Sequence, residues 1–483
     1  MTMNVDPLIG RALRRIIGRV LDLTDSPAGT RLPDPDTGRT YLLYLHVPYC
    51  TVLCPFCSFH RVAFECGAAT GYFEALRREI ELVTAAGYRF DEVYIGGGTP
   101  TVLPGQLVET IRMLKRLHPV DSVSVETNPD DLDGDSLVRL RDAGVNRLSV
   151  GVQSLDDGLL EEMGRYEKYG SGAQIRERLA AAGGLVDTLN VDLIFNLPHQ
   201  TEASLCRDMD ILVDGVGVDQ ISFYPLMSVE STRKKMSRTM GAVDYSRERS
   251  FYRIIADRML GSGYSRASAW CFSRTPGMVD EYIVDRDEYV GLGSGSFSYL
   301  DGSLLASTFS INHYKRLVAP GKTGTTGRRA MSERDRMRYY LLMRLFGGTL
   351  DLPAADRRFG GRFLRVLWPE LLALRASGAV RKSGGRLSLT ESGQYLWVMM
   401  MREFFTGVNA LREQMRHRIS RESVLVPRAP AIASNHDIGA ARDSALIAGP
   451  ATDANDDVGS RRPDQGRISH GRSGQEHAAP HVE

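Results

Sequence analysis

Three cysteines stand close together in the first part of the chain, at Cys50, Cys54 and Cys57. Their CxxxCxxC spacing follows an apolar stretch that reads as a strand, so a short loop can turn three thiolates toward one point. Thiolates are soft ligands that favour iron–sulfur clusters or zinc. A closed zinc site needs a fourth protein ligand, and the candidates are Cys66, His46 and His60. A four-iron cluster held by three cysteines instead leaves one iron open to a small molecule.

A glycine segment and several polar residues follow later predicted strands. The segment GGGTP at 96–100 comes directly after one strand. Glycines let backbone polar groups approach a ligand closely, although a plain strand-to-helix turn is the alternative. Glu126 ends the next strand and Gln153 ends the one after it. Asp192 lies within a later strand, where a buried carboxylate without a partner is unfavourable, so we expect it to contact a ligand.

The elements that position these residues alternate between strands and helices. We expect strands at 41–47, 91–98, 121–127, 146–152, 188–195 and 220–226. We expect helices at 72–87, 105–118, 135–144 and 202–215. This alternation is typical of βα units around a parallel sheet, in which ligands bind at the carboxyl ends of the strands. The sequence therefore predicts an α/β fold with a partial (β/α)6 barrel, because the rhythm is lost after residue 230.

The remaining chain is expected to form further segments around this core. The expected segments are a helical extension over 1–40, the barrel core over 41–230, an extension over 231–330, a winged-helix-like domain over 331–425 and a disordered tail over 426–483. The winged-helix prediction rests on helices at 334–348, 362–378 and 390–405 with a hairpin at 379–389. The tail contains no aromatic residue or cysteine and cannot bury enough apolar surface to offset its ordering entropy.

The N-terminal extension contains one amphipathic pattern. Residues 7–21 place apolar side chains at helical spacing and four arginines on the other face. Such a helix packs on the main domain or lies on a membrane surface.

Composition excludes several classes of protein. The 483 residues carry 60 basic and 59 acidic side chains, a formal net charge of +1, which gives no electrostatic reason to expect nucleic-acid binding. No stretch approaches the ~20 apolar residues of a membrane-spanning helix, and the N-terminus lacks the apolar core of a signal peptide. We therefore expect a cytoplasmic protein with reduced thiols.

Five ordered motifs in residues 41–300 resemble a known family. They read LYLHVPYC, YIGGGTPTVL, ETNPDDL, RLSVGVQSLDDGLLEEMGR and VDLIFNLPHQT. The CxxxCxxC loop after the first strand is similar to that of the radical S-adenosylmethionine (SAM) enzymes. The motifs around it resemble the oxygen-independent coproporphyrinogen III oxidases and the related radical SAM heme chaperones.

The resemblance implies cofactors and the residues that bind them. It implies that Cys50, Cys54 and Cys57 hold a [4Fe–4S] cluster whose open iron takes the amino and carboxylate groups of SAM. The residues that it places at SAM are Tyr44, Phe56, Gly97, Gly98, Thr99, Glu126, Gln153, Arg165 and Asp192. Arg165 is expected at the SAM carboxylate, since a guanidinium suits that group, whereas Gln153 and Asp192 are expected at the ribose. The alternative for Tyr44 and Phe56 is that both rings pack in the core without contacting SAM.

The chain also departs from its relatives. Phe59 replaces a further cysteine of the oxidases, and 278–288 lacks the histidine of the chaperones' heme-binding motif, although Tyr289-Val-Gly291-Leu-Gly293 is kept. Three functions therefore stay open: an oxidase-like enzyme acting on a tetrapyrrole, a methyltransferase using two SAM molecules, and a heme chaperone. Either enzyme needs an electron donor such as flavodoxin or ferredoxin. Trp270 and Tyr282 line a flat aromatic substrate pocket or pack in the core.

Overall fold

The computed structural model describes residues 24–25, 29–227, 230–275 and 286–425. All of these residues belong to one compact unit by their contacts. The predicted helix over 7–21, Tyr282 and the predicted tail over 426–483 lie outside the described residues. No helix in the described ranges is long and apolar enough to cross a membrane.

A large mixed sheet carries the fold. In the described part of the chain, thirteen strands form one sheet in the order β1-β15-β14-β13-β12-β2-β5-β6-β7-β8-β9-β11-β10. Its centre is a parallel series of β2 (Tyr41–Val47), β5 (Phe90–Gly97), β6 (Ser122–Thr127), β7 (Arg147–Gln153), β8 (Thr188–Phe195) and β9 (Gln220–Pro225). These are the six strands that the sequence predicts, each within two residues of its expected ends. The α/β class is confirmed, and within the described residues the sheet does not close on itself.

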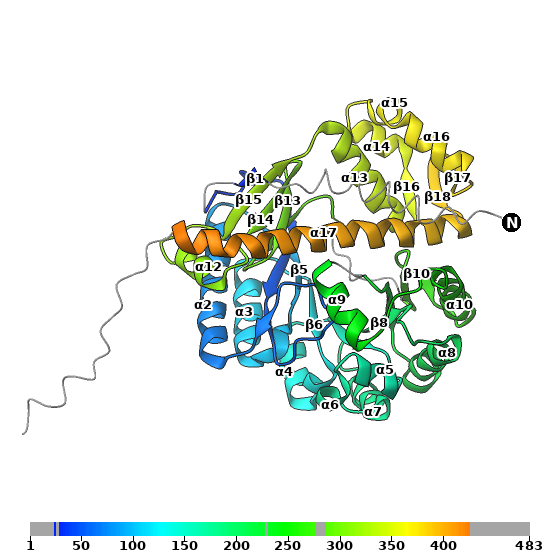
Figure 1. The fold of residues 1–483 in the computed structure, drawn as a ribbon. Coiled ribbons are helices and arrows are strands. Elements are labelled where there is room, and N and C mark those ends of the chain that lie inside the picture. Colours follow the sequence, from blue (N-terminus) through cyan, green and yellow to red (C-terminus); the bar gives the residue numbers. More distant parts are fainter. Residues whose placement is uncertain (1–23, 26–28, 228–229, 276–285, 426–483) are drawn as a thin grey trace, which may run out of the picture. The chain divides into compact units, whose positions relative to one another are not determined.

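Burial explains why these segments are strands. Every residue of β2 is buried, as expected for a strand with a covered surface on both faces. The helices α2 (Cys66–Ala85), α3 (Pro104–Leu117) and α4 (Gly134–Ala143) follow one another along the outside of the parallel strands (Figure 1). The next helices are α5 (Asp157–Glu162), α6 (Tyr166–Tyr169), α7 (Gly172–Ala182) and α8 (Glu202–Asp210), which continues as the π-helical segment η3 (Ile211–Val216).

Helix α2 begins six residues before its predicted start. The Glu65 side chain caps it by accepting hydrogen bonds from the backbone N–H groups of Gly67 and Ala68, at 2.9 and 2.6 Å. Satisfying these otherwise unpaired donors lets the helix begin at Cys66.

A second group of strands extends the sheet beside β2. It contains β12 (Tyr289–Leu292), β13 (Phe297–Leu300), β14 (Ser303–Ser307), β15 (Thr325–Ala330) and the short β1 (Thr24–Asp25). Only β12 is parallel to its neighbour β2, and the others pair antiparallel. At the other end of the sheet, β11 (Cys271–Ser273) and β10 (Ser265–Arg266) are also antiparallel. Helices α9 (Glu230–Thr239), α10 (Glu248–Gly261) and α12 (Ile311–Val318) connect these parts.

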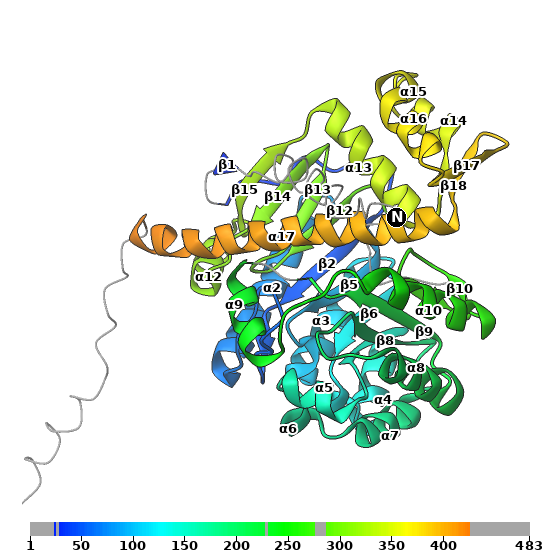
Figure 2. The same cartoon turned by 45° about the vertical axis from the view of Figure 1, so that its right-hand side comes forward.

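Residues 331–425 contain short helices, a small sheet and one long helix. The helices are α13 (Glu333–Phe346), α14 (Leu352–Arg358), α15 (Phe363–Val366) and α16 (Trp368–Ala376), and β16 (Thr349–Asp351), β17 (Val380–Ser383) and β18 (Arg386–Leu389) form a three-stranded sheet. Whether this segment is a winged-helix-like domain stays a prediction. The following helix α17 (Glu391–Leu425) has 35 residues and runs from the small sheet to the side of α12 (Figures 1 and 2). It therefore ends twenty residues beyond the predicted end at residue 405.

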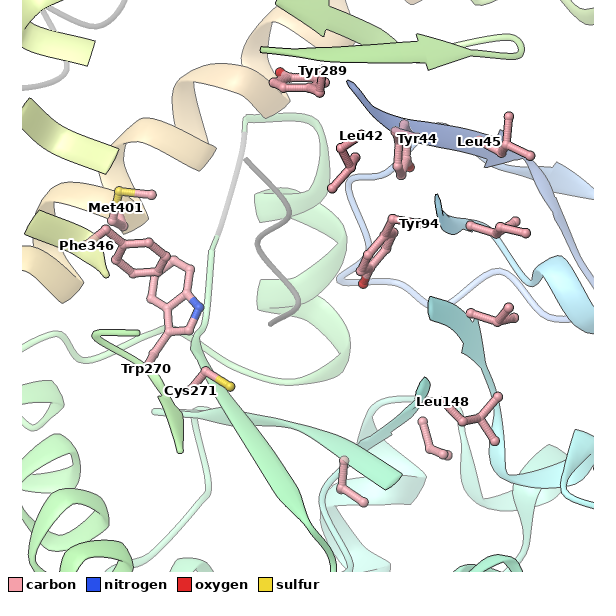
Figure 3. Close-up of a cluster of buried hydrophobic side chains, with 14 of the residues drawn as sticks. Leu42, Tyr44, Leu45, Tyr94, Leu148, Trp270, Cys271, Tyr289, Phe346 and Met401 are labelled. Atoms are coloured by element: carbon pink, nitrogen blue, oxygen red, sulfur yellow. The ribbon is translucent and has the colours of Figure 1, made fainter. Parts of the chain in front are cut away.

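Helix α17 is held to the barrel by buried polar contacts as well as by apolar packing. Arg402 forms an ion pair with Glu248 of α10, whose side chain is fully buried. The indole N–H of Trp397 donates a 3.0 Å hydrogen bond to the Leu342 carbonyl of α13. The aromatic core beneath contains Trp270, whose ring centroid lies 4.9 Å from that of Phe346 (Figure 3). Trp270 is completely buried, so it packs in the core.

Candidate functional site

One cavity opens at the carboxyl ends of the parallel strands. Its volume is about 2080 Å³, counting the part that is open to solvent. All twelve residues that the sequence singles out line it, namely Tyr44, Cys50, Cys54, Phe56, Cys57, Gly97, Gly98, Thr99, Glu126, Gln153, Arg165 and Asp192. Their roles as cofactor ligands stay a prediction, but the fold brings them together from six strands and three loops.

The cysteine loop leaves the sheet directly after β2. Cys50 belongs to the short strand β3 (Tyr49–Cys50), which pairs with β4 (Val62–Ala63) and so joins the two ends of the loop. Within the loop the backbone N–H of Cys57 donates to the Cys54 carbonyl at 3.4 Å. Cys50 and Cys54 are buried, Cys57 is half-buried, and all three are free thiols.

The donor set fits a cluster better than a single ion. In the described ranges no group of three or more His, Cys, Asp or Glu side chains is gathered around a point that one metal ion could occupy. A [4Fe–4S] cluster does not need such a point, because each thiolate binds a different iron. The three fourth-ligand candidates for zinc, Cys66, His46 and His60, do not line the cavity. Burial also raises the pKa of the Cys50 thiol to about 11, so a thiolate there calls for a bound cation.

The glycine segment passes close beneath this loop. A side chain at Gly98 would place its Cβ 2.7 Å from the Tyr49 carbonyl oxygen, and one at Gly97 would meet the ring of His46 at 2.6 Å. Gly97 also has a φ of +118°, a conformation that favours glycine. Its N–H donates to a Glu126 carboxylate oxygen at 2.9 Å. The glycines therefore bring bare backbone up to the cysteine loop and expose it to the cavity.

Arg165 lies deep in the cavity, with 3% of its surface exposed. Its guanidinium donates to the Cys54 sulfur at 3.5 Å and to the Gly151 carbonyl. It also lies over the ring of Tyr169, 4.2 Å from the centroid. The Asn128 amide links the Arg165 guanidinium to the glycine segment. It accepts from Arg165 and donates to the Thr99 hydroxyl at 2.8 Å. A fixed positive charge therefore stands beside a predicted cluster ligand.

Gln153 and Asp192 lie on neighbouring strands. The register of β7 against β8 shifts between Gly151 and Gln153, and Gln153 has a φ of +75°. Such bulges and left-handed residues redirect side chains at functional sites. Asp192 accepts hydrogen bonds from the Ser149 hydroxyl at 3.0 Å and the Asn190 amide at 2.8 Å. Asp192 therefore has protein partners and also lines the cavity, and its expected contact with a ligand stays a prediction.

Tyr44 and His46 form a buried pair on β2. The Tyr44 hydroxyl and the Nδ1 atom of His46 are 2.9 Å apart, and the Nε2 atom of His46 is 2.8 Å from the His60 carbonyl oxygen. Burial lowers the pKa of His46 to about 4, so the ring is neutral near pH 7. Tyr44 thus has a fixed orientation where it lines the cavity.

The far wall of the cavity was not expected from the sequence. It consists of Tyr289, Phe297, Tyr299, Tyr339, Phe404, Phe405, Val408, Leu411 and Arg412, from β12, β13, α13 and α17. One signal for it exists: Val408, Leu411 and Met415 continue the helical spacing of apolar residues beyond 405. The cavity therefore has a polar, sulfur-bearing side on the barrel and an aromatic side on the C-terminal part.

Comparison with protein families identifies the barrel side. Residues 44–212 match the family model described as the radical SAM superfamily. This part of the chain therefore carries the sequence pattern of the radical SAM superfamily. The superfamily uses a [4Fe–4S] cluster and SAM, so these are the cofactors of the protein. The resemblance read from the five motifs is thereby confirmed.

Curated relatives extend the match beyond this domain. The chain is 28% identical over 369 residues to the "heme chaperone HemW" of Bacillus subtilis, covering 73% of this chain and 96% of the relative. It is 26% identical over 392 residues to an "oxygen-independent coproporphyrinogen III oxidase" of Bradyrhizobium diazoefficiens, covering 76% and 86%. Among solved structures, coproporphyrinogen III oxidase (HemN) from Escherichia coli has a TM-score of 0.64 at 20% identity, covering 81% of this chain and 93% of that one. The matched part of this chain therefore has the same fold as that enzyme.

Proposed function

We propose that this protein is a radical SAM enzyme that acts on a tetrapyrrole, in a reaction like that of the coproporphyrinogen III oxidases. The two sides of one cavity carry the proposal. The barrel side holds three thiols and the expected SAM contacts, and the far wall offers tyrosine and phenylalanine rings. The expected SAM contacts and these rings line the same cavity, and flat aromatic molecules pack well on such rings.

In this proposal the barrel side of the cavity holds the cluster and the methionine part of SAM. Cys50, Cys54 and Cys57 hold the cluster, which, when bound, supplies the electron that splits SAM into methionine and a 5′-deoxyadenosyl radical. Arg165 binds the SAM carboxylate with its guanidinium. The backbone of Gly97 and Gly98 and the Thr99 segment receive the SAM amino group.

The other SAM contacts orient the nucleoside. Gln153 and Asp192 take the ribose hydroxyls, and the hydrogen bonds to Asp192 from Ser149 and Asn190 fix its carboxylate in place. Tyr44, Phe56 and Glu126 complete the wall around SAM. These side chains hold SAM between the glycine segment and the cysteine loop.

The electron for SAM cleavage has to reach the cysteine loop from outside. Leu53 and Phe59 of this loop are 42% and 43% exposed. A flavodoxin or ferredoxin that docks over this exposed part of the loop is the proposed donor.

A heme chaperone is the second candidate. It is favoured by the HemW relatives and by Phe59, which stands where the oxidases carry a further cysteine. It is opposed by the lining of the cavity, because none of the described residues that line it is a histidine. The methyltransferase alternative gains no support from the relatives named above.

Product analysis separates the two candidates. The reconstituted protein is incubated anaerobically with SAM, dithionite and coproporphyrinogen III, and in parallel is titrated with heme. The proposal predicts loss of CO₂ from the propionates together with 5′-deoxyadenosine, and weak heme binding. Stoichiometric heme binding with a stable Soret band and no decarboxylation would instead support the chaperone.

A further inference from the structure

Two arginines, one within the cysteine loop and one on α17, bind the main chain of this loop. The Nη2 atom of Arg61 donates to the carbonyls of Cys54 and Cys57, the latter at 2.9 Å. The Nη2 atom of Arg416 donates to the carbonyls of Ser58 and Phe59, the former at 3.1 Å. Guanidinium groups thus bind four carbonyls of the loop, three of them at the consecutive positions 57–59.

The second of these arginines comes from a distant part of the sequence. Arg416 lies on α17, more than 350 positions after the loop that it binds. One turn earlier on α17, Arg412 lies over the ring of Phe59, 4.6 Å from its centroid. Helix α17 therefore contributes to the aromatic wall of the cavity and also contacts the cysteine loop.

The positive charges at this place are crowded. Within the described residues neither Arg61 nor Arg416 forms an ion pair with a carboxylate. Burial lowers the pKa of Arg416, and the charges of Arg412 and Arg61 lower it further, whereas the Cys57 sulfur and the Glu413 carboxylate raise it. Three guanidiniums grouped in this way repel one another, and an anion among them removes that penalty.

We propose that Arg61 and Arg416 compensate the charge of the iron–sulfur cluster and thereby raise its reduction potential. The inference rests on the proposed cluster ligands. A [4Fe–4S] cluster with three thiolates is negatively charged, and reduction adds one further electron. Fixed positive charges and hydrogen bonds around a cluster favour the reduced form. Their hydrogen bonds to the loop carbonyls hold the two guanidiniums near the cluster. Their positive charges can then stabilise the reduced cluster.

A redox titration of reconstituted full-length protein tests this inference. The reduced-cluster signal is followed by electron paramagnetic resonance, without SAM, in the wild type, Arg416→Gln, Arg416→Lys and Arg61→Gln. Each Gln variant loses one positive charge, so we expect the equilibrium constant for reduction to fall about tenfold or more, which is ~59 mV for one electron. Arg416→Lys keeps the charge and should stay close to the wild-type potential. The control Arg375→Gln removes an exposed arginine of α16 that does not line the cavity, and should change nothing.

Iron content and apoprotein melting temperature are measured on the same samples. Wild-type potentials in both Gln variants, with full iron content, would overturn the inference and leave the cluster assignment intact. A wild-type protein that binds no cluster would overturn both. If one Gln variant does not fold, the other decides, because the two arginines lie on separate elements and the same shift is expected of each.

Discussion

A Cys54→Ser protein should emerge from anaerobic reconstitution without its cluster. Cys54 is buried at the inner side of the loop, where its sulfur accepts from Arg165 at 3.5 Å. With only three protein thiolates, the cluster has no spare ligand, and a hydroxyl is a much weaker ligand for iron than a thiolate. The measurement is the broad iron–sulfur absorption near ~400 nm together with the iron content per chain.

Cys66→Ser is the matched control for this experiment. Cys66 is exposed at the first turn of α2 and does not line the cavity, so its variant should keep wild-type iron. A Cys54→Ser protein that takes up a full complement of iron would show that the cluster has other ligands.

The second large effect is expected in SAM binding. Replacing Arg165 with Ala removes the buried positive charge proposed to meet the SAM carboxylate. A hydrogen bond to a charged group contributes roughly 1.5–3 kcal/mol, so the dissociation constant for SAM should rise about tenfold or more. Equilibrium binding to cluster-loaded protein measures it.

Two further variants calibrate this result. Arg165→Lys keeps the charge but not the planar fork, and should fall between Arg165→Ala and the wild type. Asp192→Asn should weaken SAM binding less than Arg165→Ala, because an amide oxygen still accepts from a ribose hydroxyl. Unchanged SAM affinity in Arg165→Ala would remove Arg165 from the site.

Much of the barrel could be predicted because its signals are local. The buried strand at 41–47 reads as a continuous apolar run, and the structure has the same limits. The run of glycines at 96–98 indicates a close backbone approach, and the structure has one, with Gly97 against the His46 ring and Gly98 against the Tyr49 carbonyl. Each inference needs only a short window of sequence.

The other half of the cavity depends on contacts between distant segments. The strands β12 to β15 pair antiparallel with one another and do not follow the strand–helix alternation that would link them to β2. Helix α17 is stabilised far beyond residue 405 by its packing, and the contact of Arg416 with Phe59 leaves no local pattern. Similarly, the hydrogen bond between Ser149 and Asp192 could not be read from the sequence, because the two residues lie on different strands.

The most direct test of the account is the formation of 5′-deoxyadenosine. Wild-type protein reconstituted with iron and sulfide is incubated anaerobically with SAM and dithionite, and the products are separated by liquid chromatography. The account predicts slow release of 5′-deoxyadenosine by the wild type and Cys66→Ser, and none by Cys54→Ser. Cluster-loaded wild-type protein that forms no 5′-deoxyadenosine, with or without coproporphyrinogen III, would contradict the proposal that this protein is a radical SAM enzyme.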